Sequence, residues 1–173
     1  MADPKPSTAG QRTAIAAGLA AAIAIPSEGV KLTPYWDPPG ILTVCRGHTG
    51  ADIVKGRQYS LAECDRLFTD DMRAKIVAVE RCQPGLPIEV LAAFSDAAFN
   101  LGPAIACDPR KSTAARLLNA KLYEAACRQL PRWDKASVAG VMVSLPGLTK
   151  RRALEMDLCL QGARAAASQG AAP

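Results

Sequence analysis

The sequence has few aromatic side chains, a single histidine and no long run of basic residues. Phenylalanine, tryptophan and tyrosine together make up 5% of the 173 residues. The 21 basic and 16 acidic residues give a net charge of +5, which is spread along the chain. Nucleic-acid-binding domains usually gather basic residues in a patch or combine them with stacking aromatics, so we expect no nucleic-acid partner. Dispersed positive charge favours binding to an anionic surface, and solubility alone is the alternative explanation.

The sequence also lacks the cysteine and histidine spacings of a metal site. Its six cysteines form no C-x-x-C motif and the lone histidine has no second ligand near it, so we expect no bound metal. The even cysteine count favours disulfides in an oxidising compartment over buried reduced thiols. We expect Cys45 to pair with Cys64, because a hairpin and the helix after it share one lobe. The other expected pairs are Cys107 with Cys127 and Cys82 with Cys159.

No apolar run is long enough to span a bilayer firmly. Residues 13–25 are uncharged and contain seven alanines, three isoleucines and one leucine. As a helix, the uncharged span 13–27 reaches about 22 Å, whereas the hydrocarbon core of a bilayer is about 30 Å thick. Three interpretations stay open: a weakly apolar anchor that later leaves the membrane, a cleaved signal peptide, or a first soluble helix packed by Ile15, Leu19 and Ile23.

Composition and length indicate one mainly helical α+β domain. Apolar residues make up 49% of the chain, and its alanine-rich stretches favour helices. A chain of 173 residues is large enough for two lobes within one domain. Between Tyr35 and Arg46, the turn signal Pro38-Pro39-Gly40 separates two short extended runs and predicts a hairpin.

A long amphipathic helix is predicted from about residue 61 to 81. It begins with a capping box, in which Ser60 and Glu63 satisfy each other's backbone N–H groups, and its apolar residues recur every three or four positions. At about 30 Å, this helix is long enough to join two lobes across a cleft. Further helices are expected at 87–101, 112–119, 122–130 and from the 145–152 segment to about 160.

Two carboxylic acids and a hydroxyl occur in one short stretch of the chain. Glu28 is followed nine positions later by Asp37, and six positions after that by Thr43. Near a helix end and a hairpin, these groups suit cleavage of a glycosidic bond by water. One carboxyl protonates the leaving oxygen, while the other, with the hydroxyl, holds and deprotonates the water. Asp37 taken alone would be a turn-capping residue, but the joint spacing favours catalysis.

The stretch that begins at Glu28 resembles the phage lysozymes of glycoside hydrolase family 24. The order E-x8-D-x5-T followed by G-H-T keeps both family spacings, so the resemblance implies a catalytic triad of Glu28, Asp37 and Thr43. It also implies a two-lobed lysozyme-like fold, with a small hairpin lobe joined by a long helix to a helical lobe. Cys45 stands where many family members have a glycine. A cysteine at this position resembles the lambdoid endolysins that have a signal-anchor-release segment. The similarity extends to about Cys159.

Further residues are expected to support this site. The resemblance implies that His48 pairs with Asp71 on the following helix, with Asp70 as the alternative. Asn100 resembles a polar residue that faces substrate in relatives, although a helix C-terminal cap explains it equally well. Tyr35 is a candidate for a sugar-facing surface.

The segment G-L-T-K-R-R resembles the family's G-L-x-x-R-R motif. The resemblance implies that Arg151 or Arg152 approaches the catalytic acid and lowers its pKa by opposite charge, and a structural ion pair is the alternative. Trp133 stands where the family has a core tryptophan. We divide the chain into a leader (1–11), a weakly apolar helix (12–26), a catalytic domain (27–161) and a frayed tail (162–173).

The resemblance implies hydrolysis of the β-1,4 bond between N-acetylmuramic acid and N-acetylglucosamine in peptidoglycan, and lysis of the host cell. No cofactor is expected, and the enzyme is expected to act as a monomer. It would be exported to the host periplasm, at first tethered to the inner membrane by residues 13–25. The alternatives are a lytic transglycosylase, which uses no water, and a non-catalytic wall-binding or membrane-disrupting protein.

Overall fold

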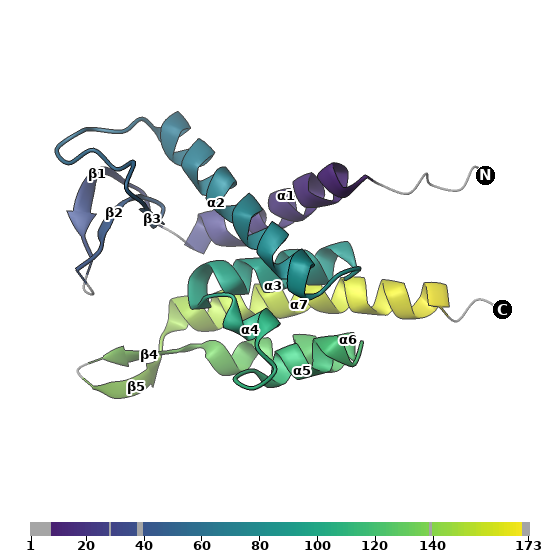
Figure 1. Ribbon diagram of the computed structural model, residues 1–173. Helices are drawn as coiled ribbons and strands as arrows, with labels where there is room; N and C mark the ends of the chain where they lie inside the picture. Colours follow the sequence, from purple (N-terminus) through teal and green to yellow (C-terminus); the bar gives the residue numbers. More distant parts are fainter. Residues whose placement is uncertain (1–7, 28, 38–39, 139, 171–173) are drawn as a thin grey trace.

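The computed structural model describes residues 8–27, 29–37, 40–138 and 140–170. Figure 1 shows a small β lobe beside a larger helical lobe, which is the mainly helical α+β architecture predicted from the sequence. The helices are α1 (Ala9–Ser27), α2 (Leu61–Cys82), α3 (Ile88–Leu101), α4 (Ala104–Cys107), α5 (Thr113–Asn119), α6 (Tyr123–Cys127), the 3-10 helix η1 (Leu130–Trp133) and α7 (Pro146–Gly170). The strands are β1 (Lys31–Trp36), β2 (Leu42–Cys45), β3 (His48–Thr49), β4 (Lys135–Val138) and β5 (Val141–Ser144).

The small lobe is built on a three-stranded antiparallel sheet in the order β1-β2-β3. Tyr35 of β1 lies opposite Thr43 of β2, so the hairpin expected between Tyr35 and Arg46 is confirmed. Pro38 and Pro39 at its turn lie outside the described residues. The lobe has its own small core, made by Val44, Cys45, Ile53, Tyr59 and Cys64.

Helix α2 joins the two lobes. Its capping box forms as predicted: the Ser60 hydroxyl accepts from the N–H of Glu63, and the Glu63 carboxylate accepts from the N–H of Ser60. Cys64 near its start belongs to the small-lobe core. Four later residues belong to the core of the helical lobe, namely Phe68, Met72, Ile76 and Val79. Because 22 residues rise about 33 Å as a helix, α2 reaches from one lobe to the other (Figure 1).

The core of the helical lobe forms around α3. Every residue from Val90 to Ala98 is buried, and α1, α2 and α7 pack against this helix. Pro87 is its N-cap, in agreement with the helix expected at 87–101. A helix that is apolar on nearly all sides needs neighbours on all sides, which these three helices supply.

The disulfides are only partly those expected. Cys45 pairs with Cys64, which confirms the link between the hairpin and α2. The pairings of Cys107 with Cys127 and Cys82 with Cys159 are wrong. The bonds join Cys82 to Cys107 and Cys127 to Cys159. The reason is packing, because α4 lies against the end of α2 and α6 lies against α7.

The first helix begins earlier than expected. A leader was predicted for residues 1–11, but α1 starts at Ala9, and residues 1–7 lie outside the described ranges. The cause is a second capping box: Thr8 Oγ1 accepts from the N–H of Gln11, and Gln11 Oε1 accepts from the N–H of Thr8. In the parts of the chain that the structure describes, no helix is long and apolar enough to cross a membrane.

Helix α1 packs through small side chains. Ala16, Ala17, Ala20 and Ala24 belong to the core of the helical lobe, and Ile23 is buried as well. Leu19 is partly buried against the same core, but Ile15, expected to pack with it, is 49% exposed. A face of alanines lets helix backbones approach closely, and this face leaves Ile15 on the outer side.

Helix α7 is longer than expected and the predicted frayed tail is wrong for residues 162–170. The helix was expected to end near residue 160, but it continues to Gly170. Gly162 and Ala163 are buried, because this part of α7 packs against the start of α3. A tail of small residues is therefore used for close helix packing. Residues 171–173 lie outside the described ranges.

A second hairpin, β4–β5, follows η1 and was not predicted. Lys135 pairs with Ser144 and Val138 with Val141, with Gly140 at positive φ in the turn. The helix expected at 122–130 is shorter, because α6 ends at Cys127 and η1 follows.

Candidate active site

Thr43 lies on the central strand of the small lobe. It is 3% exposed, and β2 carries it between β1 and β3, opposite Tyr35 and Thr49. Its hydroxyl donates to the carbonyl oxygen of Ile41 at 3.1 Å. The hydroxyl is thus held beside the turn of the hairpin.

Asp37 lies at the other side of the same turn. Its Oδ1 accepts from the N–H of Ile41 at 2.7 Å, and its own N–H donates to the carbonyl of Ile41 at 3.0 Å. Ile41 therefore binds both Asp37 and Thr43, so the hairpin holds two of the three predicted catalytic residues against one backbone unit. Asp37 therefore does cap the turn through its side chain. The side chain is also half-buried.

Glu28, the predicted acid, lies outside the described residues. In the chain it directly follows the last residue of α1, and two residues separate it from β1. The structure therefore describes the elements on both sides of Glu28 and the two partners predicted for it.

His48 is held between two aspartates. Its Nδ1 lies 2.8 Å from Oδ2 of Asp71, and its Nε2 lies 3.2 Å from the carboxylate of Asp52. The expected partner is thus Asp71, while the alternative, Asp70, is exposed and lies 3.7 Å from Arg73. Asp52 was missed, although its position four residues after the histidine was a usable signal.

A buried ion pair connects α3 to the start of α7. Arg151 donates to both oxygens of Asp96, with Nε and Nη2 at 3.0 and 2.8 Å. Asp96 is fully buried and Arg151 is 2% exposed. A bidentate pair of this kind holds the guanidinium in one orientation. Asp96 was not predicted, because one acid in the middle of a largely apolar helix carries no spacing signal.

Arg152 and Glu155 extend this cluster, and both are completely buried. Nη2 of Arg152 lies 2.6 Å from Oε1 of Glu155 and 3.3 Å from Oδ1 of Asn100. Burial, and then hydrogen bonding to Asp96, raise the pKa of Glu155 to about 10, although the charge of Arg152 acts in the opposite direction. Burial outweighs the nearby guanidinium because no solvent reaches the carboxyl group.

A hollow of about 240 Å³ lies where the two lobes meet. Its lining comes from the β2–β3 turn, β3, α2 and the end of α3, with the residues Gly47, Thr49, Asp71, Ala74, Lys75 and Phe99. Asn100, which follows Phe99 in the chain, is exposed. Tyr35 is half-buried on β1, with Nζ of Lys31 3.8 Å from the centre of its ring.

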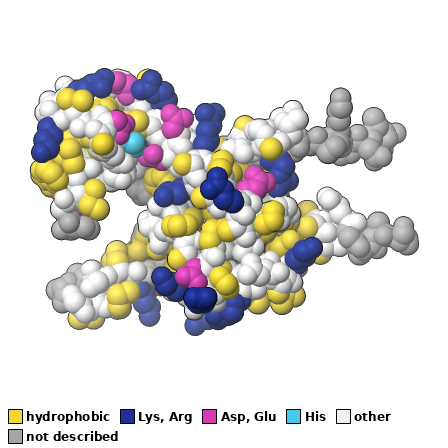
Figure 2. Space-filling view, in the orientation of Figure 1, with side chains coloured by type: hydrophobic (Ala, Val, Ile, Leu, Met, Phe, Trp, Pro, Cys, Tyr) yellow, Lys and Arg dark blue, Asp and Glu magenta, His cyan; other side chains and the backbone are white. Residues whose placement is uncertain are grey.

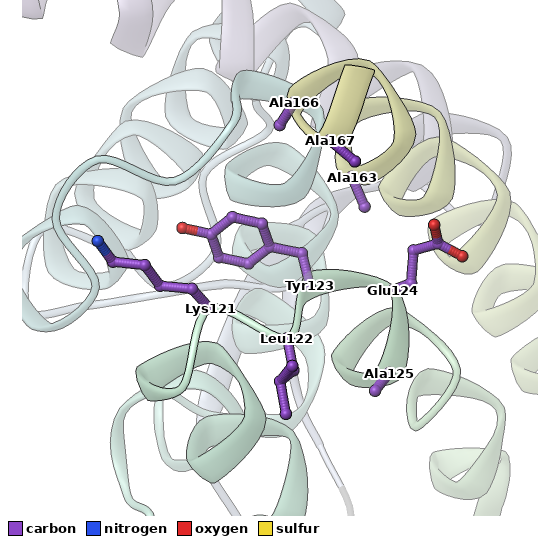
Figure 3. A pocket seen from close by; sticks show the side chains of 8 residues that line it. All are labelled: Lys121, Leu122, Tyr123, Glu124, Ala125, Ala163, Ala166 and Ala167. Carbon is purple, nitrogen blue, oxygen red and sulfur yellow. The ribbon is translucent and has the colours of Figure 1, made fainter. Parts of the chain in front are cut away.

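Another hollow, of about 430 Å³, lies far from these groups in the chain. Figure 3 shows its lining from α6, the two residues before it and the C-terminal half of α7, and four of the eight lining residues are alanines. We do not assign the active site there, because it contains none of the predicted catalytic residues. On the face shown in Figure 2, basic side chains are scattered over both lobes, as the dispersed charge predicted.

The chain is similar to phage proteins along most of its length. The family model described as phage lysozyme matches residues 26–155. A SAR-endolysin of Bacteriophage PS119 is 37% identical over 139 residues, covering 78% of this chain and 77% of that protein. A SAR-endolysin of Escherichia phage Mu is 38% identical over 135 residues, covering 76% and 72%.

Solved structures show the same fold. An endolysin from Escherichia coli O157:H7 phage FAHEc1 aligns with a TM-score of 0.67 at 25% identity, covering 83% of this chain and 90% of that one. The active form of the P1 phage endolysin Lyz gives a TM-score of 0.68 at 20% identity, covering 90% and 95%. Its secreted inactive form gives 0.51 at 20% identity, covering 88% and 95%.

Proposed function

This chain belongs to the phage lysozyme family, and on that basis we propose that it is an endolysin that lyses the host cell. It is a glycoside hydrolase of the muramidase class, and its substrate is bacterial peptidoglycan. The bond that it hydrolyses is the β-1,4 bond between N-acetylmuramic acid and N-acetylglucosamine. The family match over residues 26–155 includes all three predicted catalytic residues.

One observation carries the mechanism: Asp37 and Thr43 both bind Ile41, so they lie together at one hairpin turn. In this mechanism Glu28 is the general acid that protonates the leaving oxygen. Asp37 and Thr43 hold a water on the opposite face of the sugar, and Asp37 accepts its proton. The configuration at the anomeric carbon is then inverted, and the two carboxyls are about 6.5 to 9.5 Å apart.

The buried arginines support this site from the helical lobe. Asp96 fixes Arg151 at the start of α7, and this guanidinium is the charge that we propose acts on Glu28. An opposite charge nearby lowers the pKa of a carboxyl group. His48 has a different role: its ion pair with Asp71 holds β3 against α2, and its ion pair with Asp52 ties β3 to the turn that follows it.

Residues 13–25 act first as a tether to the inner membrane and later as the core of α1. The relatives named SAR-endolysin support this export route to the host periplasm. The alanine-rich face of α1 also supports release from the membrane. Transfer of alanine into lipid gains little free energy, and the same face packs well against α3. The described fold aligns better with the active form of Lyz than with its secreted inactive form.

We propose that residues 27–161 make up the catalytic domain and that the enzyme acts as a monomer. The test is digestion of purified peptidoglycan, followed by mass spectrometry and proton NMR of the products. Hydrolysis adds one water, or about 18 Da, per bond cut, and inversion gives the α-anomer first. Products that lack this water would indicate a lytic transglycosylase, and a first-formed β-anomer would contradict the assigned roles of Asp37 and Thr43.

A further inference from the structure

Trp36 is a large apolar side chain that the proposed mechanism does not use. It ends strand β1 and is 61% exposed. It pairs with Leu42, whereas its neighbour Tyr35 pairs with Thr43. Because successive residues of a strand point to opposite faces of the sheet, Trp36 and Thr43 lie on opposite faces. The indole is therefore directed away from the face that carries the proposed catalytic hydroxyl, and its exposure needs another explanation.

The loop before α2 places a positive charge beside this indole. Nζ of Lys55 lies 5.0 Å from the centre of the Trp36 ring. The N–H of Val54 donates to the hydroxyl of Tyr59 at 3.0 Å, and the N–H of Tyr59 donates to the carbonyl of Leu32 on β1 at 2.7 Å. These bonds hold the loop against the sheet. Trp36 and Lys55 thus form one surface, which we call the indole face.

The charge of Lys55 is available to a partner outside the protein. The acids near it in the chain have other partners, since Asp52 pairs with His48 and Glu63 pairs with Arg57. Within the described ranges no carboxylate pairs with Lys55. An exposed cation beside an exposed indole suits the boundary of an anionic bilayer, where the ammonium binds phosphate and the ring enters the headgroup region. Figure 2 shows both basic and hydrophobic side chains at the outer edge of the small lobe.

The indole face is also close in the chain to the segment proposed to enter the membrane. Helix α1 ends at Ser27 and β1 begins at Lys31, so only three residues separate the two elements. Trp36 comes nine positions after the end of α1. Nine residues span at most about 32 Å. Trp36 therefore stays near the lipid surface while residues 13–25 are inserted.

We infer that the indole face is a docking surface for anionic phospholipid, through which the small lobe binds the outer surface of the inner membrane. Trp36 enters the headgroup region, and Lys55 binds lipid phosphate. This contact goes beyond the proposed tether, because it uses the folded lobe and does not require residues 13–25 to be in the bilayer. Its binding is reversible, since a few side chains at the interface bind far more weakly than an inserted helix.

The experiment measures how the purified full chain partitions onto vesicles of phosphatidylglycerol and phosphatidylethanolamine. Trp36→Gln removes the indole, and Lys55→Gln removes the charge. We expect the first variant to weaken binding about tenfold, as loss of one buried apolar side chain implies, and the second about fivefold. Binding of the wild type should weaken as salt is added, because salt screens exposed charges. Binding that both variants leave unchanged would overturn the inference.

The matched controls lie on the β4–β5 hairpin of the helical lobe. Met142→Gln removes an apolar side chain from a residue that is 62% exposed, and Lys135→Gln removes one exposed positive charge. We expect each control to change binding by less than about twofold, because these groups lie outside the indole face. Losses equal to those of the Trp36 and Lys55 variants would mean that binding is spread over the whole surface, and the inference would be wrong.

A spectroscopic measurement tests the contact without altering the indole face. The chain has two tryptophans, so Trp133→Phe leaves Trp36 as the only one. We expect vesicles that contain brominated phospholipid to quench its fluorescence, and an absence of quenching would contradict the docking.

Hydrolysis of lipid-free peptidoglycan separates the membrane from the wall as the partner. Trp36→Gln and Lys55→Gln should keep the wild-type rate. A lower rate together with unchanged vesicle binding would assign the indole face to the wall and overturn the inference. The hydrolase assignment is tested separately by Glu28→Gln on the same lipid-free material, so it does not depend on the vesicle result.

Discussion

The Nδ1 atom of His48 lies 2.8 Å from Oδ2 of Asp71, which ties strand β3 to helix α2. Burial lowers the pKa of His48, but the hydrogen bonds and charges of Asp71 and Asp52 together outweigh burial and raise the pKa above its usual value. A raised pKa means that the folded state binds the proton more tightly than the unfolded chain. Protonated His48 therefore stabilises the folded protein.

Asp71→Asn is expected to destabilise the protein in a pH-dependent way. The stabilisation is fully present below the pKa of the unfolded histidine, about 6.5, and disappears as pH rises through the raised folded value. We expect a loss of about 1.5 to 3 kcal/mol at pH 5 and a smaller loss at pH 9, measured by urea unfolding. Asp70→Asn, at an exposed neighbour, should cost under about 1 kcal/mol. An Asp71→Asn loss that is the same at both pH values would contradict the ion pair.

Glu155→Gln is expected to be tolerated although it removes a buried acid. With a pKa of about 10, Glu155 is neutral in the folded protein at pH 7, and glutamine has nearly the same shape. In the unfolded chain the group ionises near pH 4.3, so the stability of the wild type falls as pH rises above that value, by up to about 1.4 kcal/mol per pH unit. Glu155→Gln removes this slope.

Urea unfolding between pH 5 and pH 9 measures the effect. The variant should be at least as stable as the wild type at pH 8, and its stability should depend less on pH. Glu124→Gln, an exposed acid 3.7 Å from Arg128, is the control and should keep the wild-type slope. A loss of about 3 to 5 kcal/mol for Glu155→Gln at pH 7 would instead indicate an ionised buried pair.

Gly162→Ala is expected to destabilise α7 despite the higher helix propensity of alanine. A Cβ at Gly162 would lie 2.7 Å from Cβ of Glu89 and 3.3 Å from the backbone nitrogen of Val90, so α7 and α3 would have to separate. We expect a cost of about 1 to 3 kcal/mol. In α1, a Cβ at Gly18 has no atom within 4 Å, and Gly18→Ala should stabilise by up to about 1 kcal/mol. Thermal unfolding checks both, and two changes of the same sign would contradict the packing.

Cys45 is expected to tolerate glycine better than alanine once its disulfide is removed. It has a φ of +61°, a conformation that disfavours side chains with a Cβ, and its bond to Cys64 holds it there. In a Cys64→Ala background, Cys45→Gly should be about 1 to 2 kcal/mol more stable than Cys45→Ala. Both should be less stable than the wild type by about 2 to 4 kcal/mol. Urea unfolding of the two double variants tests this, and a more stable alanine variant would contradict it.

Local signals in the sequence predicted the elements that carry the site. The capping box at Ser60 and Glu63 predicted the start of α2, and the proline-glycine turn predicted the hairpin that carries Asp37 and Thr43. These signals are local because the interacting groups lie within a few residues of each other. The Cys45–Cys64 bond could be predicted for the same reason, since it closes one compact lobe.

The missed features depend on contacts between distant segments. The Asp96–Arg151 pair spans 55 residues, and the Cys82–Cys107 bond depends on how α4 meets α2. The extension of α7 beyond Gly162 was missed because small residues resemble a frayed tail until a neighbouring helix is known to lie against them. Composition gives the helix propensity of a segment, and packing against a neighbouring helix decides whether the segment folds as a helix.

Glu28 is expected to protonate the leaving oxygen of the glycan bond. The direct test is the rate at which Glu28→Gln releases reducing ends from purified peptidoglycan, with thermal unfolding measured on the same sample. Loss of a positioned general acid costs about 10² to 10⁴-fold. We predict a loss of at least about a hundredfold with an unchanged unfolding temperature, whereas a variant that keeps the wild-type rate would contradict the account.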